Sequence, residues 1–404
     1  MTNKQAAIQI IRRLRKAGFQ ALLAGGCVRD MLLGKKPKDH DVVTDATPAE
    51  VCKIFRRTIK VGAKFGVIII LADSQQVEVA TFRTETGYTD GRRPDKVSFT
   101  SAQQDALRRD FTINGMFYDP LQKKVIDYVG GQKDLKSKNL RTIGKADERF
   151  SEDYLRMLRA VRFAAQLDFE IEKNTLIAVK KYSGRITKIS GERIAAELEL
   201  LSAAAGRKKG VKLLIKTGLA ERIFPIFKNA RTAELAVKVF DYLPKGIVFE
   251  LAVAALFVAC RTGDAMENLK ILKLSRNQLK HIKFLLERRG YLLNGDMGLA
   301  HLKLISSEPY FEDLYSLQKA IQKADGKSLS ALLTVRRRAD ALAGSQLRPK
   351  PLLNGHELIQ LGAEPGPQVG HVGRELYIEQ LSENITTKQQ AINWVKNWLK
   401  RHNG

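Results

Sequence analysis

Two aspartates, Asp39 and Asp41, are separated by one residue and follow a glycine pair at residues 25–26. If residues 38–43 form a strand, alternate side chains point to one face, so the two carboxylates would lie together and His40 would point away. Proteins usually hold Mg²⁺ with one or two carboxylates and the phosphates of a substrate. The glycines would let the backbone approach a phosphate, and a helix after them would direct its N-terminus at that charge. The pattern therefore predicts a magnesium site at which a phosphate-bearing substrate reacts.

A second candidate group lies in residues 152–165, where the sequence predicts one helix. Asp153, Arg156, Arg159 and Arg162 recur at every third position, which places them along one side of that helix. Apolar residues occupy the other side and would pack. Three arginines on one side repel one another unless anions lie nearby, so a triphosphate or an RNA backbone is the natural partner. Taken alone, the same pattern also describes a solvated, salt-bridged helix face.

Hydrophobic periodicity indicates the elements that must position these residues. Helices are predicted at residues 5–17, 47–55 and 189–198, the last without assigned chemistry, and strands at 20–24, 66–71, 77–82 and 125–128. Thr47 would be the N-cap of the second helix, with Pro48 in its first turn, and the strands that flank Asp73 predict a hairpin. Beyond about residue 147 the strand signals stop, and helical patterns run almost to the C-terminus. The predicted fold class is α+β, with an N-terminal head of mixed sheet and helices followed by an all-α part.

The charge and cysteine content of the chain indicate the kind of partner it binds and the compartment in which it works. The chain has 69 Lys and Arg against 43 Asp and Glu, a formal charge of +26, which predicts a polyanionic partner. No apolar run approaches the length of a membrane span, and the charged N-terminus does not resemble a signal peptide. Three cysteines without metal-ligand spacing suit a reducing cytoplasm. We therefore expect a cytoplasmic protein with no membrane partner.

Four ordered blocks carry a family resemblance and cover roughly the first half of the chain. They are GGCVRDMLLG with KDHD (residues 25–34 and 38–41), RRDFTIN (108–114), DYVGGQKDL (127–135) and RFSEDYLRMLRAVRF (149–163). Together they resemble the class II tRNA nucleotidyltransferase and bacterial poly(A) polymerase family, whose catalytic head belongs to the DNA polymerase β superfamily.

The resemblance implies a domain organisation and an activity. A polymerase β-like head would occupy residues 1–146, a neck 147–205, a helical body 206–290 and a tRNA-binding helical tail 291–404. The activity would be addition of C, C and A to the 3′ end of tRNA from CTP and ATP, with release of pyrophosphate.

The resemblance also implies roles for individual residues. Asp39 and Asp41 would be the catalytic residues and would hold Mg²⁺. Nucleotide binding would involve phosphate, sugar and base contacts from Gly26, Arg29, Arg109, Asp153, Arg156, Arg159 and Arg162. Within this set, Asp153 and Arg156 would select cytosine or adenine and act as a protein template.

Three alternatives share these motifs. An A-adding enzyme would act only on tRNA that already ends in CC. A poly(A) polymerase is less favoured, because in residues 60–67 a glycine follows the aromatic residue and the chain lacks a highly basic tail. A non-catalytic RNA-binding module would not require the aspartate pair.

Two further features bear on this choice. Residues 84–100 are mostly polar, predict a surface loop at least as far as Lys96, and resemble the loop with which bacterial CCA-adding enzymes switch from CTP to ATP. This argues against an enzyme that adds only C. Glu78, on a predicted strand, is either a third metal-site carboxylate or an ion-paired strand residue.

Overall fold

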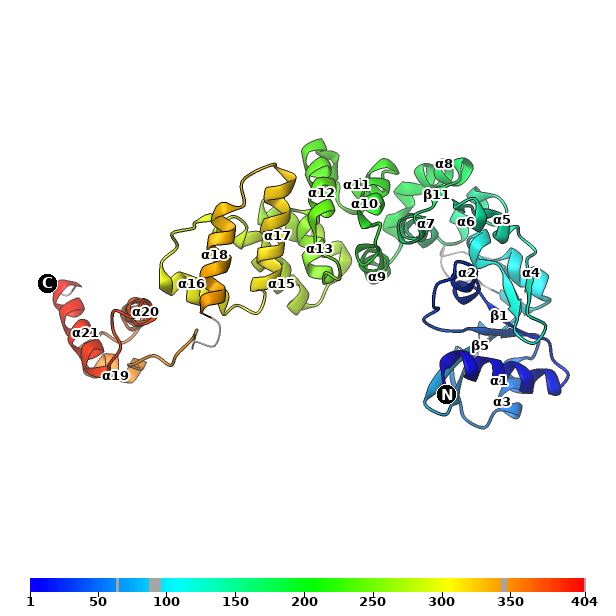
Figure 1. Ribbon diagram of the computed structural model, residues 1–404, viewed down its shortest axis with the longest axis horizontal. Helices are drawn as coiled ribbons and strands as arrows, with labels where there is room; N and C mark the ends of the chain where they lie inside the picture. Colours follow the sequence, from blue (N-terminus) through cyan, green and yellow to red (C-terminus); the bar gives the residue numbers. More distant parts are fainter. Residues whose placement is uncertain (63–64, 87–95, 343–346, 403–404) are drawn as a thin grey trace. The chain divides into compact units, whose positions relative to one another are not determined.

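The computed structural model describes residues 1–62, 65–86, 96–342 and 347–402 (Figure 1). Contacts within the protein group the chain into two compact units, Met1–Ala230 with Asn268–Leu274, and Arg231–Glu267 with Ser275–Gly404. The predicted α+β class is confirmed, because the first unit combines a mixed sheet with helices and the described part of the second is helical. The division into four domains at residues 146, 205 and 290 stays a prediction.

The first unit begins with a sheet and the helices that cover it. Its described strands are β1 (Ala21–Ala24), β2 (Val42–Thr44), β3 (Thr58–Gly62), β4 (Val67–Ala72), β5 (Gln75–Thr81), β6 (Arg83–Thr86), β7 (Lys96–Phe99), β8 (Phe117–Asp119), β9 (Lys124–Ile126), β10 (Asn139–Leu140) and β11 (Glu170–Ile171). The helices among them are α1 (Asn3–Lys16), α2 (Gly26–Leu32), α3 (Pro48–Ile54), α4 (Ala102–Leu107), the 3-10 helix η2 (Thr112–Asn114) and α5 (Gly131–Lys136).

Within the described residues, seven strands form one mixed sheet in the order β3-β4-β5-β2-β1-β8-β9. Strands β2 and β5 run parallel, and the other neighbours are antiparallel. The predicted hairpin is confirmed, because β4 and β5 pair across a turn in which Asp73 has a positive φ of 52°. Helix α3 also begins as predicted, with Thr47 as N-cap and Pro48 in the first turn.

The core beneath this sheet is apolar and aromatic. All four residues of β1 are buried, and α1 buries one stripe of alanine, isoleucine and leucine. Phe82 and Phe117 meet edge to face with ring centroids 5.9 Å apart. A rigid sheet of this kind holds the ends of β1, β2 and β5 in fixed register, and the site is built on these ends.

Helices dominate the remainder of the first unit. They are α6 (Ala146–Glu152), α7 (Leu155–Leu167), α8 (Lys173–Tyr182), η3 (Ser183–Lys188), α9 (Gly191–Ser202), α10 (Arg207–Lys216), α11 (Leu219–Ile223), η4 (Pro225–Lys228) and η5 (Lys270–Leu272). Two expectations from the sequence are wrong here. The helix predicted over residues 152–165 is interrupted between α6 and α7, and a strand occurs after residue 147, because β11 pairs in parallel with β10.

The loop predicted over residues 84–100 is partly regular. Strand β6 pairs with β7 in an antiparallel ladder that joins Thr84 to Ser98, so both ends of the predicted loop are strands. Residues 87–95 of this loop, to which the resemblance assigns the switch from CTP to ATP, lie outside the described residues.

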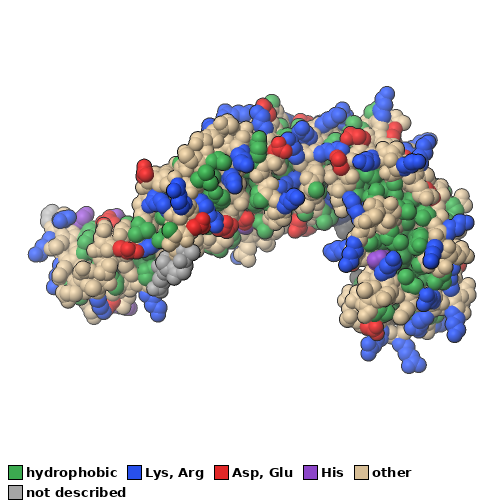
Figure 2. Space-filling model, viewed as in Figure 1, with side chains coloured by type: hydrophobic (Ala, Val, Ile, Leu, Met, Phe, Trp, Pro, Cys, Tyr) green, Lys and Arg blue, Asp and Glu red, His purple; other side chains and the backbone are tan. Residues whose placement is uncertain are grey.

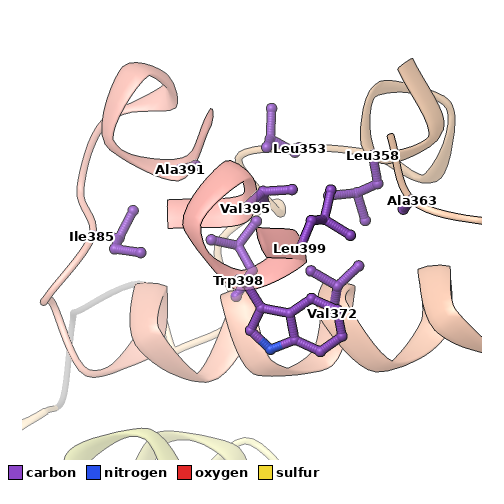
Figure 3. Close-up of a cluster of buried hydrophobic side chains, with 10 residues drawn as sticks. Leu353, Leu358, Ala363, Val372, Ile385, Ala391, Val395, Trp398 and Leu399 are labelled. Atoms are coloured by element: carbon purple, nitrogen blue, oxygen red, sulfur yellow. The ribbon is translucent and has the colours of Figure 1, made fainter. Parts of the chain in front are cut away.

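Helices also make up the described part of the second unit. They are α12 (Ala230–Tyr242), α13 (Phe249–Leu256), α14 (Thr262–Leu269), α15 (Arg276–Arg288), η6 (Tyr291–Leu293), α16 (Leu299–Ser306), α17 (Phe311–Ala324), α18 (Ser330–Ala341), α19 (Gly355–Gln360), α20 (Pro367–Leu381) and α21 (Lys388–His402). The last three helices share a small core in which Val372, Val395 and Trp398 are buried (Figure 3). Among the described helices, none has both the length and the apolar character needed to cross a bilayer.

Candidate active site

One pocket of about 540 Å³ in the first unit collects most of the residues singled out by the sequence. The turn between β1 and α2, the ends of β2 and β5, the segment from Arg108 to Asn114, and helices α7 and α9 contribute to it. Its lining includes Gly25, Gly26, Arg29, Asp41, Glu78, Arg83, Arg108, Arg109, Asp110, Asn114, Asp153, Arg156, Arg159, Phe163 and Arg193.

The aspartate pair precedes β2 rather than lying within it. The carbonyl oxygen of Asp41 still accepts a hydrogen bond from the amide of Ala24 (3.1 Å), which continues the pairing of β1 with β2 by one residue. Asp39 and Asp41 are exposed, whereas His40 is 6% exposed and its ring lies against the side chain of Asn3. Exposure therefore alternates along residues 39–41 as predicted, although the regular strand starts only at Val42. That the two carboxylates act at one site stays a prediction.

Glu78 lies next to Asp41 for a topological reason. Strands β2 and β5 pair in parallel with Val42 opposite Val79, so the residues one step earlier, Asp41 and Glu78, are also neighbours. Both line the pocket, whereas Asp39 does not. The structure thus brings Glu78, which the sequence left open, to the same place as Asp41.

The charges around Asp41 suit a divalent cation. Although Asp41 reaches solvent, the atoms of the pocket wall around its carboxylate remove part of its hydration, and the carboxylates of Glu78 and Asp39 add repulsion, so the pKa of Asp41 is raised to about 6. A cation bound there would relieve both penalties. Among the described residues no cluster of three or more His, Cys, Asp or Glu side chains is preassembled for a metal. Mg²⁺ fits this donor set, because it is commonly held by one or two carboxylates together with substrate phosphates and water.

The glycine turn brings the backbone close to two arginines. Gly25 has a φ of 74°, and a Cβ placed on it would lie 3.2 Å from Arg109. Arg29, one turn into α2, is 5% exposed, pairs with Asp30 at 2.8 Å and donates to the amide oxygen of Asn114 at 2.8 Å. Residues larger than glycine would therefore crowd the cationic floor of the pocket.

A buried carboxylate holds Arg109 in place. Asp105 on α4 is 1% exposed and pairs with Arg109 at 2.9 Å and with Arg108 at 2.7 Å. Burial alone would raise the pKa of Asp105, but the two guanidinium groups outweigh it, and the net shift is downward. Asp105 thus fixes both arginines in position at the wall of the pocket.

A second buried carboxylate links the segment after α4 with helix α7. Asp110 accepts hydrogen bonds from Arg159 at 2.6 Å and from the side-chain amide of Asn114 at 3.2 Å. Because Asn114 also accepts from Arg29, the chain Arg29–Asn114–Asp110–Arg159 crosses the pocket floor. Burial opposes ionisation of Asp110, yet Arg159 holds its pKa at about 2.

We expect the Asp110–Arg159 pair to stabilise the first unit in a pH-dependent manner. The folded pKa of about 2 lies below the ordinary value of 3.8, so this stabilisation is present above pH 4 and is lost as the pH falls towards 2. Asp110→Asn should lower the free energy of unfolding at pH 7 by about 2 kcal/mol, and the deficit should shrink between pH 4 and 2. Urea unfolding followed by circular dichroism measures it, with the exposed Asp45→Asn as control. A deficit that does not change with pH contradicts the assignment.

Asp153 and Arg156 both line the pocket, and the amide of Arg156 donates to the carbonyl oxygen of Asp153 (3.0 Å), but their charged side chains pair with other residues. Asp153 lies between α6 and α7, accepts the amide of Leu155 at 3.0 Å, and forms an ion pair with Arg193 at 2.8 Å. Arg156, in the first turn of α7, instead pairs with Glu152. The interruption of the predicted helix therefore gives each residue its own counter-charge and leaves both side chains facing the pocket.

Arg162, like Asp39, is a predicted site residue that does not line the pocket. It is 7% exposed and its guanidinium pairs with Glu197 at 2.6 Å, so it is not among the lining residues, although Arg159 is. Its guanidinium carbon lies 4.0 Å from the centre of the Phe163 ring. A spacing of three along a helix turns successive residues by less than a full turn, so Arg162 points towards α9 rather than into the pocket.

Sequence reasoning missed several lining residues. Arg193 is the clearest case, because the sequence predicts a helix without assigned chemistry over residues 189–198. Arg108, Asp110 and Asn114 belong to a block that carries the family resemblance, but they have no predicted role of their own. The available signal was the spacing of Arg193 and Glu197, which places opposite charges four residues apart on one face of α9. Neither pairs with the other, and each instead reaches a residue of the α6–α7 segment.

Comparisons with known families agree with this arrangement. Residues 21–141 match the family described as "Poly A polymerase head domain", and residues 168–231 match "Probable RNA and SrmB- binding site of polymerase A". The matched head contains the glycine turn, the aspartate pair and the segment from Arg108 to Asn114. Nucleotidyltransferases with this kind of head generally use a divalent metal ion.

Curated relatives and solved structures cover nearly the whole chain. The CCA-adding enzyme of Streptococcus sanguinis is 36% identical over 377 residues, which is 92% of each chain. That of Streptococcus mutans is 33% identical over 392 residues, covering 96% of this chain and 95% of the other. A CCA-adding enzyme of Bacillus stearothermophilus, solved in complex with CTP, superposes over 100% of both chains with a TM-score of 0.83 and 27% identity. With identity above 30% sustained over nine tenths of the sequence, and with the pocket built from the expected blocks, the chain belongs to the family of CCA-adding enzymes.

Proposed function

We propose that this protein adds C, C and A in turn to the 3′ end of tRNA, using CTP and ATP and releasing pyrophosphate. The observation that carries the proposal is the pocket itself, which combines Asp41 and Glu78, a set of fixed arginines, and Asp153 with Arg156 in one space of about 540 Å³. A carboxylate site, a triphosphate site and a base-reading site are the three parts that template-independent nucleotide transfer requires.

The carboxylates of Asp39 and Asp41 hold Mg²⁺ in this proposal, with Glu78 beside them. The bound ion would lower the pKa of the attacking 3′-hydroxyl and neutralise charge on the triphosphate. The protein contributes a fixed position for the carboxylates, because the amide of Ala24 and the pairing of β2 with β5 hold the chain on both sides. The 3′-hydroxyl oxygen attacks the α-phosphate and gives up its proton to solvent water, the bond from that phosphorus to the bridging oxygen breaks, and pyrophosphate leaves.

The triphosphate is bound by the arginines of the pocket floor. Gly26 allows close approach, and Arg29, Arg109 and Arg159 are each held by a carboxylate or an amide that leaves other donors free. Fixed donors need no reorganisation when the charge on the phosphates shifts during transfer. Arg162, which is paired with Glu197, acts on this pocket only through its packing with α9 and Phe163.

Base selection rests on Asp153 and Arg156. Cytosine and adenine each present an amino group at the position where uracil and guanine present a carbonyl oxygen. An ionised carboxylate accepts a hydrogen bond from the amino group and repels the carbonyl oxygen, whereas the Arg156 fork donates to ring acceptors. One carboxylate can thus separate both correct bases from both incorrect ones, which explains how a single pocket serves CTP and ATP.

The RNA partner is matched by the charge of the whole chain. The chain has a formal charge of +26, and its Lys and Arg side chains are spread over much of the visible face of each unit (Figure 2). Contacts to phosphates distributed in this way give affinity without sequence preference. We place the reaction in the cytoplasm, in keeping with three cysteines that are all free thiols.

A primer-extension assay tests the proposal. The protein is incubated with tRNA transcripts that end before C, after C and after CC, with CTP and ATP supplied separately and together. We expect C to be added to the first two and A to the third, each dependent on Mg²⁺. Addition of A alone, and only to the CC-ended transcript, would identify an A-adding enzyme. Long A tails on any RNA would identify a poly(A) polymerase, and no incorporation would leave an RNA-binding module.

A further inference from the structure

The carboxylate of Asp153 is held by two contacts of different origin. One oxygen accepts the backbone amide of Leu155 at 3.0 Å, and the other accepts Nη2 of Arg193 at 2.8 Å. The first contact is local and restrains one of the two oxygens. The second comes from a residue 40 positions along the chain and restrains the other oxygen, so that together they fix the orientation of the carboxylate.

Helix α9 is placed to deliver Arg193 to this point. It starts at Gly191, where a Cβ would lie 1.8 Å from the carbonyl oxygen of Ile271, so the first turn is in direct backbone contact with η5. One turn after Arg193, Glu197 pairs with Arg162 on α7. Both ends of this short stretch are therefore anchored, and the Arg193 side chain projects from a fixed base.

Asp153 is the partner that holds the Arg193 guanidinium. The other terminal nitrogen of Arg193, Nη1, is buried and has no hydrogen-bond partner among the described residues. An unpaired buried donor costs free energy, so the side chain is not placed here to maximise its own hydrogen bonding. The contact it does make is with the residue assigned to base selection, at the wall of the nucleotide pocket.

Removing Arg193 would also change the neighbouring arginine. Arg156 is three residues from Asp153, and its present partner is Glu152. A carboxylate released from Arg193 could turn towards Arg156, and the two base-reading groups would then satisfy each other. Arg193 therefore keeps the acceptor and the donor of the proposed template separate.

We propose that Arg193 is a positioning residue for nucleotide selection, which orients the Asp153 carboxylate so that it accepts the amino group of cytosine or adenine. The inference rests on the proposed function, since it concerns how Asp153 reads a base. Its signature is loss of discrimination between amino- and carbonyl-bearing bases. A merely structural role would lower turnover with all nucleotides alike.

The test compares kcat/KM for CTP and UTP on a tRNA transcript that lacks CCA, in the full-length protein. Arg193→Gln should lower the CTP-over-UTP ratio by about tenfold, as expected for loss of a hydrogen bond to a charged group. Arg193→Lys, which keeps the charge, should stay within about threefold of the parent. The matched control is Arg185→Gln, at an exposed arginine of η3, and it should leave the ratio unchanged. If Arg193→Gln does not fold, Arg193→Met replaces it, because it keeps the length of the side chain.

The CTP-over-UTP ratio of the double variant Asp153→Ala with Arg193→Gln separates the role of Arg193 from that of Asp153. We expect this ratio to equal that of Asp153→Ala alone, because the effect of Arg193 on selection passes through Asp153. An unchanged ratio in Arg193→Gln, with a lost ratio in Asp153→Ala, would overturn the role of Arg193 and leave the base-reading role of Asp153 intact. A parent-like ratio in Asp153→Ala would overturn both, and equal loss of rate for CTP and UTP in Arg193→Gln would reduce Arg193 to a structural residue.

Discussion

Replacing Asp41 with alanine is expected to lower nucleotide incorporation by at least about 10³-fold, because metal-assisted charge stabilisation is worth several kcal/mol. The affinity for tRNA should stay within a few-fold of the parent, since it derives from many distributed phosphate contacts. Single-turnover incorporation of CTP measures the first quantity, and filter binding of tRNA measures the second.

Asp45→Ala is the matched control for this experiment, because Asp45 is an exposed carboxylate four residues further along the chain. Applied to Asp39→Ala and Glu78→Ala, the same assay ranks the two carboxylates that raise the pKa of Asp41. Substantial activity in Asp41→Ala would remove the aspartate pair from the mechanism.

The second large effect concerns nucleotide choice. Asp153→Ala or Arg156→Ala should lower the preference for ATP over GTP on tRNA ending in CC by about 10²-fold, because a site built from polar groups rejects a ligand that leaves them unpaired. Metal-dependent turnover should persist at a reduced rate, since the carboxylates around Asp41 are untouched. Each of the four nucleotides is supplied singly, and the two variants are compared with the parent.

A matched comparison is available at the residue of α7 that directly follows Arg156. Met157 is fully buried and faces away from the pocket, so Met157→Leu should leave the preference unchanged. Equal loss of rate with all four nucleotides in the Asp153 and Arg156 variants, at parental preference, would mean that bases are selected elsewhere and that this segment only binds phosphate.

The local sequence pattern was sufficient to predict those features that depend only on one strand, helix or turn. The alternation of Asp39, His40 and Asp41 was predictable, because it depends only on extended backbone, and extended backbone persists before the regular strand begins. The cap at Thr47 and the hairpin around Asp73 were predictable for the same reason.

Which arginine side chains reach the pocket depends on ion-pair partners that are distant in the sequence, so the local pattern could not predict it. Arg159 and Arg162 look equivalent in the sequence of α7. In the structure, Arg162 pairs with Glu197 and Arg159 pairs with Asp110, and both partners are distant in the sequence. The interruption at Asp153 follows from its extended backbone between α6 and α7, with a φ of −147°. Periodicity across residues 152–165 cannot report such a break, because the residues on either side keep the composition of a helix.

The contact between Gly191 and Ile271 determines how the chain could be shortened. Residues 231–267 fold with the second unit, yet the chain returns to complete the first at Asn268–Leu274. A fragment that ended at residue 146 would leave Asp110 without Arg159, and one that ended at 230 would remove the backbone against which α9 begins. Miniaturising this enzyme is therefore not a matter of choosing a single cut. Any shortened version that preserves the base-reading wall must splice residues 268–274, or a substitute for them, back onto the first unit.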